Sequence, residues 1–147
     1  MATNLKTIKF GENGETYAVN DYPVKVSGEL TEEAMVIDFG SFNGLTELEC
    51  VVWGAAGKGD YLIFSINGTK LSFVTAGAIY ESHFYLRIKK VGNVWTADCR
   101  NRSATVTNVP EYIGRHLNGV DTITSFALNA YSGTPFAAGT KYALEGR

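Results

Sequence analysis

Apolar and polar residues alternate along most of this chain, which is the period of β-strands with two unlike faces. In the strongest case, residues 47–52, the even positions carry Leu48, Cys50 and Val52, and the odd positions include Glu47 and Glu49. We expect the Glu-bearing face of this strand to contact water. About ten such segments recur with turn residues between them, the pattern of an antiparallel sandwich or barrel.

Turn residues fix where several of these strands end. Asn67-Gly68, between residues 61–66 and 69–74, is the sharpest two-residue hairpin signal in the chain. Gly92-Asn93 turns residues 83–91 into residues 94–100. Other segments complete the prediction: an N-terminal hairpin of residues 5–10 and 16–19, an edge strand from residue 24 to 27, and strands at residues 35–39 and 103–109.

Residues 121–147 predict a terminal β-hairpin. Alternation over residues 122–129 is broken by Ser132-Gly133 and Pro135, and it resumes over residues 140–146. Residues 27–34 are the helix-like stretch, for which we expect one turn at most. No segment predicts a helix long enough for a parallel crossover, which argues against an α/β fold.

Composition agrees with one all-β domain. The chain has 147 residues, of which 45% are apolar and 19% charged, a mixture that favours sheet over disorder. Because Pro23 has no N–H for a strand ladder, we expect a break there, with residues 1–22 as an N-terminal hairpin or docking segment and residues 23–147 as the sandwich. The net charge of −2 argues against nucleic-acid binding.

The N-terminus has no apolar core of signal-peptide length, and no apolar run approaches ~18 residues. We therefore expect a protein that is made in a cytoplasm, is soluble and does not insert into a membrane.

Two cysteines, Cys50 and Cys99, lie in apolar strand-like runs. Their separation resembles an immunoglobulin pair, but that fold expects a Trp about a dozen residues after the first Cys and a Tyr where Ala97 stands. We therefore reject the immunoglobulin fold and expect buried thiols. The scattered His83 and His116 form no metal-ligand spacing with them, so no metal site or cofactor is predicted.

The sequence contains only weak candidates for a set of catalytic residues. Glu47 and Glu49 project from one strand face with roughly 6.8 Å between their backbone positions, a spacing that an inverting glycosidase could use. A solvated outer face has the same pattern, and we favour that interpretation. No G-x-S-x-G motif, oriented nucleophile or phosphate-binding loop is present, so we expect a protein that is not an enzyme.

Aromatic side chains are better candidates for contact with a ligand, because sugar rings stack on Trp and Tyr faces. Core packing is the alternative that we favour for Trp53 and Trp95, and a subunit interface would explain the loop tyrosines equally well. The candidate ligand-binding residues are Trp53, Tyr80, Tyr112 and Tyr131.

Three segments carry a resemblance to a known group of proteins. Residues 121–147, with ITSF, a polar loop and PFAAGT, resemble the closing strands of small jelly-roll-like sandwiches in bacteriophage virion proteins, notably tail-fibre and host-attachment domains. YLIFSING at residues 61–68 and LKTIKFGENGETYAVND at residues 5–21 are similar to other parts of such proteins. Glu145 departs from the aromatic or aliphatic residue that the group often carries before its last Gly.

The resemblance implies an antiparallel jelly-roll-like β-sandwich that is made in the host cytoplasm and located in the virion. It implies a tail-fibre or host-attachment component that binds a cell-surface receptor, a glycan in particular. It also implies a homotrimer that docks on other virion proteins through the N-terminal segment. A capsid or tail decoration protein is the alternative, and a carbohydrate-active enzyme is a third.

Overall fold

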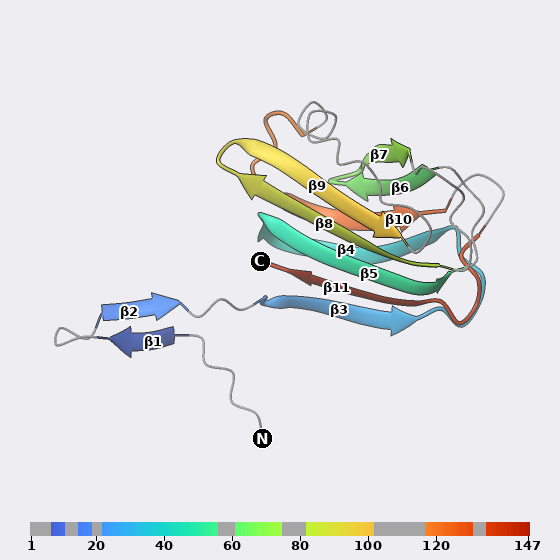
Figure 1. Cartoon of the computed structure of the whole chain (residues 1–147), viewed down its shortest axis with the longest axis horizontal. Helices are drawn as coiled ribbons and strands as arrows, with labels where there is room; N and C mark the ends of the chain where they lie inside the picture. The colour runs from blue at the N-terminus through green and yellow to red at the C-terminus, as the bar shows by residue number, and fades with distance from the viewer. Residues whose placement is uncertain are drawn as a thin grey trace, which may run out of the picture.

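The computed structural model describes residues 7–10, 15–18, 22–55, 61–74, 82–101, 117–130 and 135–147. All regular secondary structure in these residues is β-strand, as the alternation predicts, and none of these segments forms a helix of the length and apolarity needed to span a bilayer. The strands (Figure 1) are β1 Thr7–Phe10, β2 Glu15–Ala18, β3 Val24–Glu29, β4 Val36–Leu45, β5 Glu47–Ala55, β6 Tyr61–Ile66, β7 Thr69–Val74, β8 Ser82–Val91, β9 Val94–Asn101, β10 Ile123–Asn129 and β11 Lys141–Gly146.

The strands form a jelly-roll sandwich. A five-stranded sheet has the order β3-β11-β5-β8-β9, and a four-stranded sheet has the order β4-β10-β6-β7. All the strand pairs are antiparallel. The pairs are nested: β3 lies beside β11, β4 beside β10, β5 beside β8, and β6 beside β7. Such nesting is what results when one long antiparallel ribbon folds over into two stacked sheets, so the predicted fold class is confirmed.

The core fills the space between the inner faces of the two sheets. Leu48, Cys50 and Val52 of β5 have no exposed surface, as their alternation predicts. Aromatic rings from the four-stranded sheet continue this core, with the ring centroids of Phe39 and Phe126 5.5 Å apart. The other fully buried large side chains include Phe64, Ile66, Leu71, Leu86, Ile88, Trp95, Leu117 and Ile123.

The two predicted two-residue hairpins are confirmed. Asn67 and Gly68 both have positive φ, 51° and 80°, as a type I′ turn between β6 and β7 requires. The Asn67 side chain also holds β10: its Oδ1 accepts a hydrogen bond from the Thr124 N–H at 2.7 Å, and its Nδ2 donates to the Thr122 carbonyl at 3.0 Å. The turn therefore fixes a strand that is distant in sequence. Gly92, with φ 60°, turns β8 into β9.

The strand register settles the relation between the two cysteines. Cys50 on β5 and Cys99 on β9 both pair with Leu86, which lies on β8 between them. Their backbone positions are therefore two strand spacings apart, roughly 10 Å, which is beyond the Cα range of a disulfide.

The predicted terminal hairpin is wrong. β10 pairs with β4 and β6 in one sheet, whereas β11 pairs with β3 and β5 in the other. The chain therefore crosses between sheets after Asn129. Each strand finds two long partners within its own sheet, and these pairings outweigh the single ladder that a local hairpin would form. Residues 131–134 lie outside the described residues.

The predicted helical turn over residues 27–34 is also wrong. β3 continues to Glu29, and the next backbone groups bond to the segment before β11. The Leu30 N–H donates to the Thr140 carbonyl at 2.8 Å, and the Gly139 N–H donates to the Leu30 carbonyl at 2.7 Å. Ala34 forms an isolated bridge with Phe136. These partners satisfy the backbone groups that a helical turn would have used.

The N-terminal hairpin is confirmed as β1 and β2, which form their own two-stranded sheet. Thr7 lies opposite Ala18 at one end of this sheet, and Phe10 lies opposite Glu15 at the other. Figure 1 draws this sheet apart from the sandwich. β3 is an edge strand of the five-stranded sheet, as expected. The predicted strand at residues 103–109 lies outside the described residues.

Candidate functional site

β4 does not follow β10 evenly. Ala127 pairs with Asp38, Ser125 with Ser41 and Ile123 with Leu45, so β4 contains extra residues in two places. Gly40 and Gly44, with φ of 91° and 107°, lie in these irregular stretches. Positive φ values are available to glycine at no steric cost, and bulges of this kind bend a strand away from its partner.

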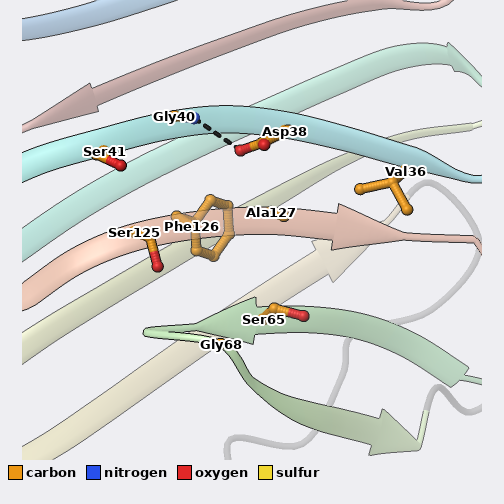
Figure 2. Close-up of a pocket in the computed structure, with 9 residues that line it drawn as sticks. All are labelled: Val36, Asp38, Gly40, Ser41, Ser65, Gly68, Ser125, Phe126 and Ala127. Atoms are coloured by element: carbon orange, nitrogen blue, oxygen red, sulfur yellow. Dashed lines mark hydrogen bonds between the residues drawn. The ribbon is translucent and has the colours of Figure 1, made fainter.

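A hollow of about 230 Å³ opens on the outer face of the four-stranded sheet beside these bulges. This volume is below the roughly 300–1,000 Å³ of pockets for drug-sized ligands, so it suits one small ring. Figure 2 shows the side chains around it, which come from β4, β10, β6 and the turn after β6. The lining residues are Val36, Asp38, Gly40, Ser41, Ser65, Gly68, Ser125, Phe126 and Ala127.

Oxygen atoms dominate the polar part of this hollow. The Asp38 Oδ1 accepts a hydrogen bond from the Gly40 N–H at 2.8 Å, which fixes the carboxylate at the rim. Asn129 Nδ2 donates to the Ser65 hydroxyl at 2.9 Å. No described residue makes a hydrogen bond to the hydroxyl of Ser41 or Ser125. These two hydroxyls and the second Asp38 oxygen are thus available to a ligand.

The lining can bind but has no means to activate a nucleophile. A serine nucleophile needs a base within hydrogen-bond reach that a third group orients. Asp38 is the one ionisable side chain of the lining, and it is bonded to a backbone N–H. Hydroxyl and carboxylate oxygens instead match the hydroxyl groups of a sugar, which both donate and accept hydrogen bonds.

Sequence reasoning missed this hollow. Its serines occur in polar, strand-like runs that carry no motif. The signal that was present is the pair Gly40 and Gly44 within ten residues of strand, because glycine inside a strand often marks a bulge.

Trp53 lies on the other sheet. It is 39% exposed on the outer face of β5, where its backbone pairs with Lys141 of β11. Core packing is therefore wrong for Trp53 and right for Trp95, which is 2% exposed and donates its Nε1–H to the Val120 carbonyl at 2.9 Å. The other three candidates, Tyr80, Tyr112 and Tyr131, and also His116, lie outside the described residues.

Glu47 lies on the outer face of β5, as alternation predicts, but it does not contact water. We expected it to face water, but it is 3% exposed because Tyr22, Arg87 and Arg147 cover it. Arg87 Nη2 lies 2.6 Å from Glu47 Oε1, and Arg147 Nη2 lies 2.7 Å from Oε2. The Tyr22 hydroxyl donates to Oε1 at 3.4 Å, and its ring lies 5.1 Å from the Arg147 guanidinium carbon. Two guanidinium groups therefore hold one buried carboxylate (the Glu47 cluster).

The electrostatics of the Glu47 cluster do not suit acid–base catalysis. Burial alone would raise the pKa of Glu47, but hydrogen bonds from Arg87 and Arg147 outweigh it and lower the pKa below its ordinary value. Burial, together with a 2.7 Å hydrogen bond to Glu49, raises the pKa of Tyr85 to about 12. Glu47 thus stays ionised and fully engaged, which is the reverse of what a general acid needs.

No protein-family model matches this chain, and no curated protein is a significant sequence match. Nor does any group of three or more His, Cys, Asp or Glu in the described ranges lie in a position to hold a metal ion.

Proposed function

We propose that this protein is a non-enzymatic host-attachment component of a bacteriophage virion, and that its sandwich binds a cell-surface glycan in the hollow over β4, β10 and β6. The observation that carries the binding function is the set of outward oxygens at Asp38, Ser41 and Ser125 around a space of about 230 Å³. The virion assignment depends on the resemblance of residues 5–21, 61–68 and 121–147 to tail-fibre domains.

One hollow of this size gives a weak contact. In the proposed particle, a homotrimer presents three hollows together, and multivalency then raises the overall affinity. The β1–β2 hairpin is the docking segment that fixes the sandwich to other virion proteins. Its separate two-stranded sheet supports this role, because none of the strands described for the sandwich pairs with it.

The binding experiment is a glycan array followed by calorimetry with the best ligand. Replacing Ser41 and Ser125 together by Leu fills the hollow, and we expect at least a tenfold loss of affinity. Unfolding stability should change by less than about 0.5 kcal/mol, as is usual for surface substitutions. Trp53→Ala, on the opposite sheet, is the matched control and should bind as the wild type does.

Two results would overturn the proposal. If Trp53→Ala abolishes binding while the double Leu variant binds normally, the ligand lies on the five-stranded sheet. If no glycan binds and labelled protein does not attach to host cells, the attachment function is wrong. A monomer by mass measurement at high protein concentration would refute the homotrimer alone.

Exposed apolar side chains favour a second candidate, a decoration protein that stabilises a capsid or tail. Val91 and Val94, at the turn between β8 and β9, are 57% and 54% exposed. Apolar residues next to each other at a hairpin tip suit contact with another protein subunit. Hundreds of copies per particle together with no cell binding would favour this candidate over attachment.

A further inference from the structure

A second, smaller hollow lies on the outer face of the five-stranded sheet. Its volume is about 140 Å³, and it is lined by Arg87 and Lys89 of β8 and by Thr96, Ala97 and Asp98 of β9. The register pairs Arg87 with Asp98 and Lys89 with Thr96. Arg87 and Lys89 are thus each opposite an oxygen-bearing side chain of β9.

Arg87 is held in place before any ligand arrives. Its Nε and Nη2 donate to Glu47 Oε1 at 3.2 and 2.6 Å, and Arg147 holds the other oxygen of the same carboxylate. A guanidinium has five N–H donors, so donors remain for a ligand. The Arg87 side chain is 41% exposed, which leaves them accessible from the hollow.

Two other polar side chains of this hollow, Lys89 and Thr96, do not belong to the Glu47 cluster. Among the described residues, no carboxylate lies within ion-pair distance of the Lys89 ammonium. Thr96 Oγ1 donates to the Lys89 carbonyl at 3.1 Å, so this hydroxyl can only accept from a ligand. The hollow therefore offers an ammonium and guanidinium donors on one side, and acceptor oxygens of Thr96 and Asp98 on the other.

We infer that this hollow binds an acidic sugar, whose carboxylate contacts Lys89 and Arg87 and whose ring hydroxyls donate to Asp98 and Thr96. A neutral sugar would leave the Lys89 charge without a partner. A bare inorganic anion would satisfy the cations but has no hydroxyl to donate to the oxygens of Asp98 and Thr96. The ligand that matches all four side chains carries both an anionic group and hydroxyl donors.

The site is independent of the proposed function, because it lies on the opposite sheet from the hollow over β4. Its failure would leave that function intact, and the reverse also holds.

The test is an NMR titration of ¹⁵N-labelled protein with glucuronate, glucose and inorganic sulfate in parallel. We expect glucuronate alone to shift the backbone amides of Lys89, Thr96 and Asp98. Arg87 is unsuitable for substitution, because its loss would uncover the buried Glu47 carboxylate. Lys89→Gln should weaken glucuronate binding at least tenfold, since one charge-assisted contact is lost. Lys141→Gln, an exposed lysine on the same sheet face, should bind as the wild type does.

Asp98→Asn supplies the second variant. It replaces a carboxylate oxygen with an amide that can donate to an anion, so sulfate should bind this variant more tightly than the wild type, while glucuronate, which loses an acceptor for its hydroxyls, binds less tightly. The inference is wrong if glucose shifts the same amides as strongly as glucuronate, if wild-type protein binds sulfate as well as glucuronate, if millimolar glucuronate shifts no amide of β8 or β9, or if Lys89→Gln leaves its affinity unchanged.

Discussion

Replacing Glu47 by Gln should destabilise the sandwich more than any other single change on the outer face of the five-stranded sheet. Gln keeps the shape of the side chain and removes its charge. The variant removes the carboxylate charge that both guanidinium groups share, at a position where the side chain is 3% exposed, and it leaves Arg87 with only the looser pair to Glu49 at 3.7 Å. Breaking a buried ion pair by removing one partner costs roughly 3–5 kcal/mol when the remaining charge stays buried.

The structure places this case below that range. The side chains of Arg87 and Arg147 are 41% and 29% exposed, so water can solvate part of the charge that is left. We therefore expect a loss of about 2–3 kcal/mol in the free energy of unfolding. For a domain of this length, that corresponds to a fall in Tm of about 6–10 °C.

Urea unfolding monitored by circular dichroism measures the loss directly. Glu49→Gln is the matched control, because Glu49 is a neighbouring carboxylate on the same face with a 32% exposed side chain, 3.7 Å from Arg87 Nε. An exposed pair of that kind contributes less than about 1 kcal/mol. If the two variants lose equal stability, the buried Glu47 carboxylate contributes no more to the free energy of unfolding than the exposed Glu49 does.

The pH dependence gives an independent check. Since the pKa of Glu47 is lower in the folded protein than its ordinary value near 4.5, its ionised form contributes stability above that ordinary value. The contribution is lost as the pH falls through the lower, folded-state pKa. The stability difference between the wild type and Glu47→Gln should therefore shrink from about pH 7 to about pH 3. A constant difference would contradict the assignment.

Three further predictions concern other parts of the sandwich. The ring resonances of Tyr85 should titrate near pH 12, and in Glu49→Gln the pKa of Tyr85 should fall towards 10. Because the pKa of Tyr85 is raised in the folded protein, the contribution of Tyr85 to stability is complete below pH 10 and is lost as the pH rises through 12. Asn67→Gly keeps the positive φ but removes the side-chain bonds to β10, so it should cost about 1–2 kcal/mol in urea unfolding, and no loss would show that those bonds contribute nothing. Acrylamide should quench exposed Trp53 readily and buried Trp95 poorly, and Trp53→Phe should remove the quenchable fraction; a single quenching class in the wild type would contradict their different exposure.

Local signals in the sequence predicted those parts of the fold that local interactions decide. Asn67-Gly68 specifies a turn with two positive φ values, and β6 and β7 pair on either side of it with the predicted bounds. The alternation over residues 48–52 likewise identified a buried face. Both features depend on residues within one hairpin or one strand.

Other features depend on residues that are far apart in the chain. Alternation places Glu47 on the outer face correctly, but it cannot show that Tyr22, Arg87 and Arg147 cover that position. The prediction of a terminal hairpin was wrong for the same reason: the partners of β10 and β11 are distant in sequence and lie in different sheets. Predicting the hollow over β4 would have required the pairing of β4 with β10, because it is against β10 that Gly40 and Gly44 create bulges.

The nested order of the strand pairs also sets the sequence distance over which each contact must form. β6 and β7 are joined by two residues, whereas β3 and β11 come from opposite ends of the sandwich segment. Closing a longer loop costs more chain entropy, and non-local pairing slows folding. We therefore expect assembly to start at the Asn67 turn and to proceed outwards, with β3 the last strand to join its sheet.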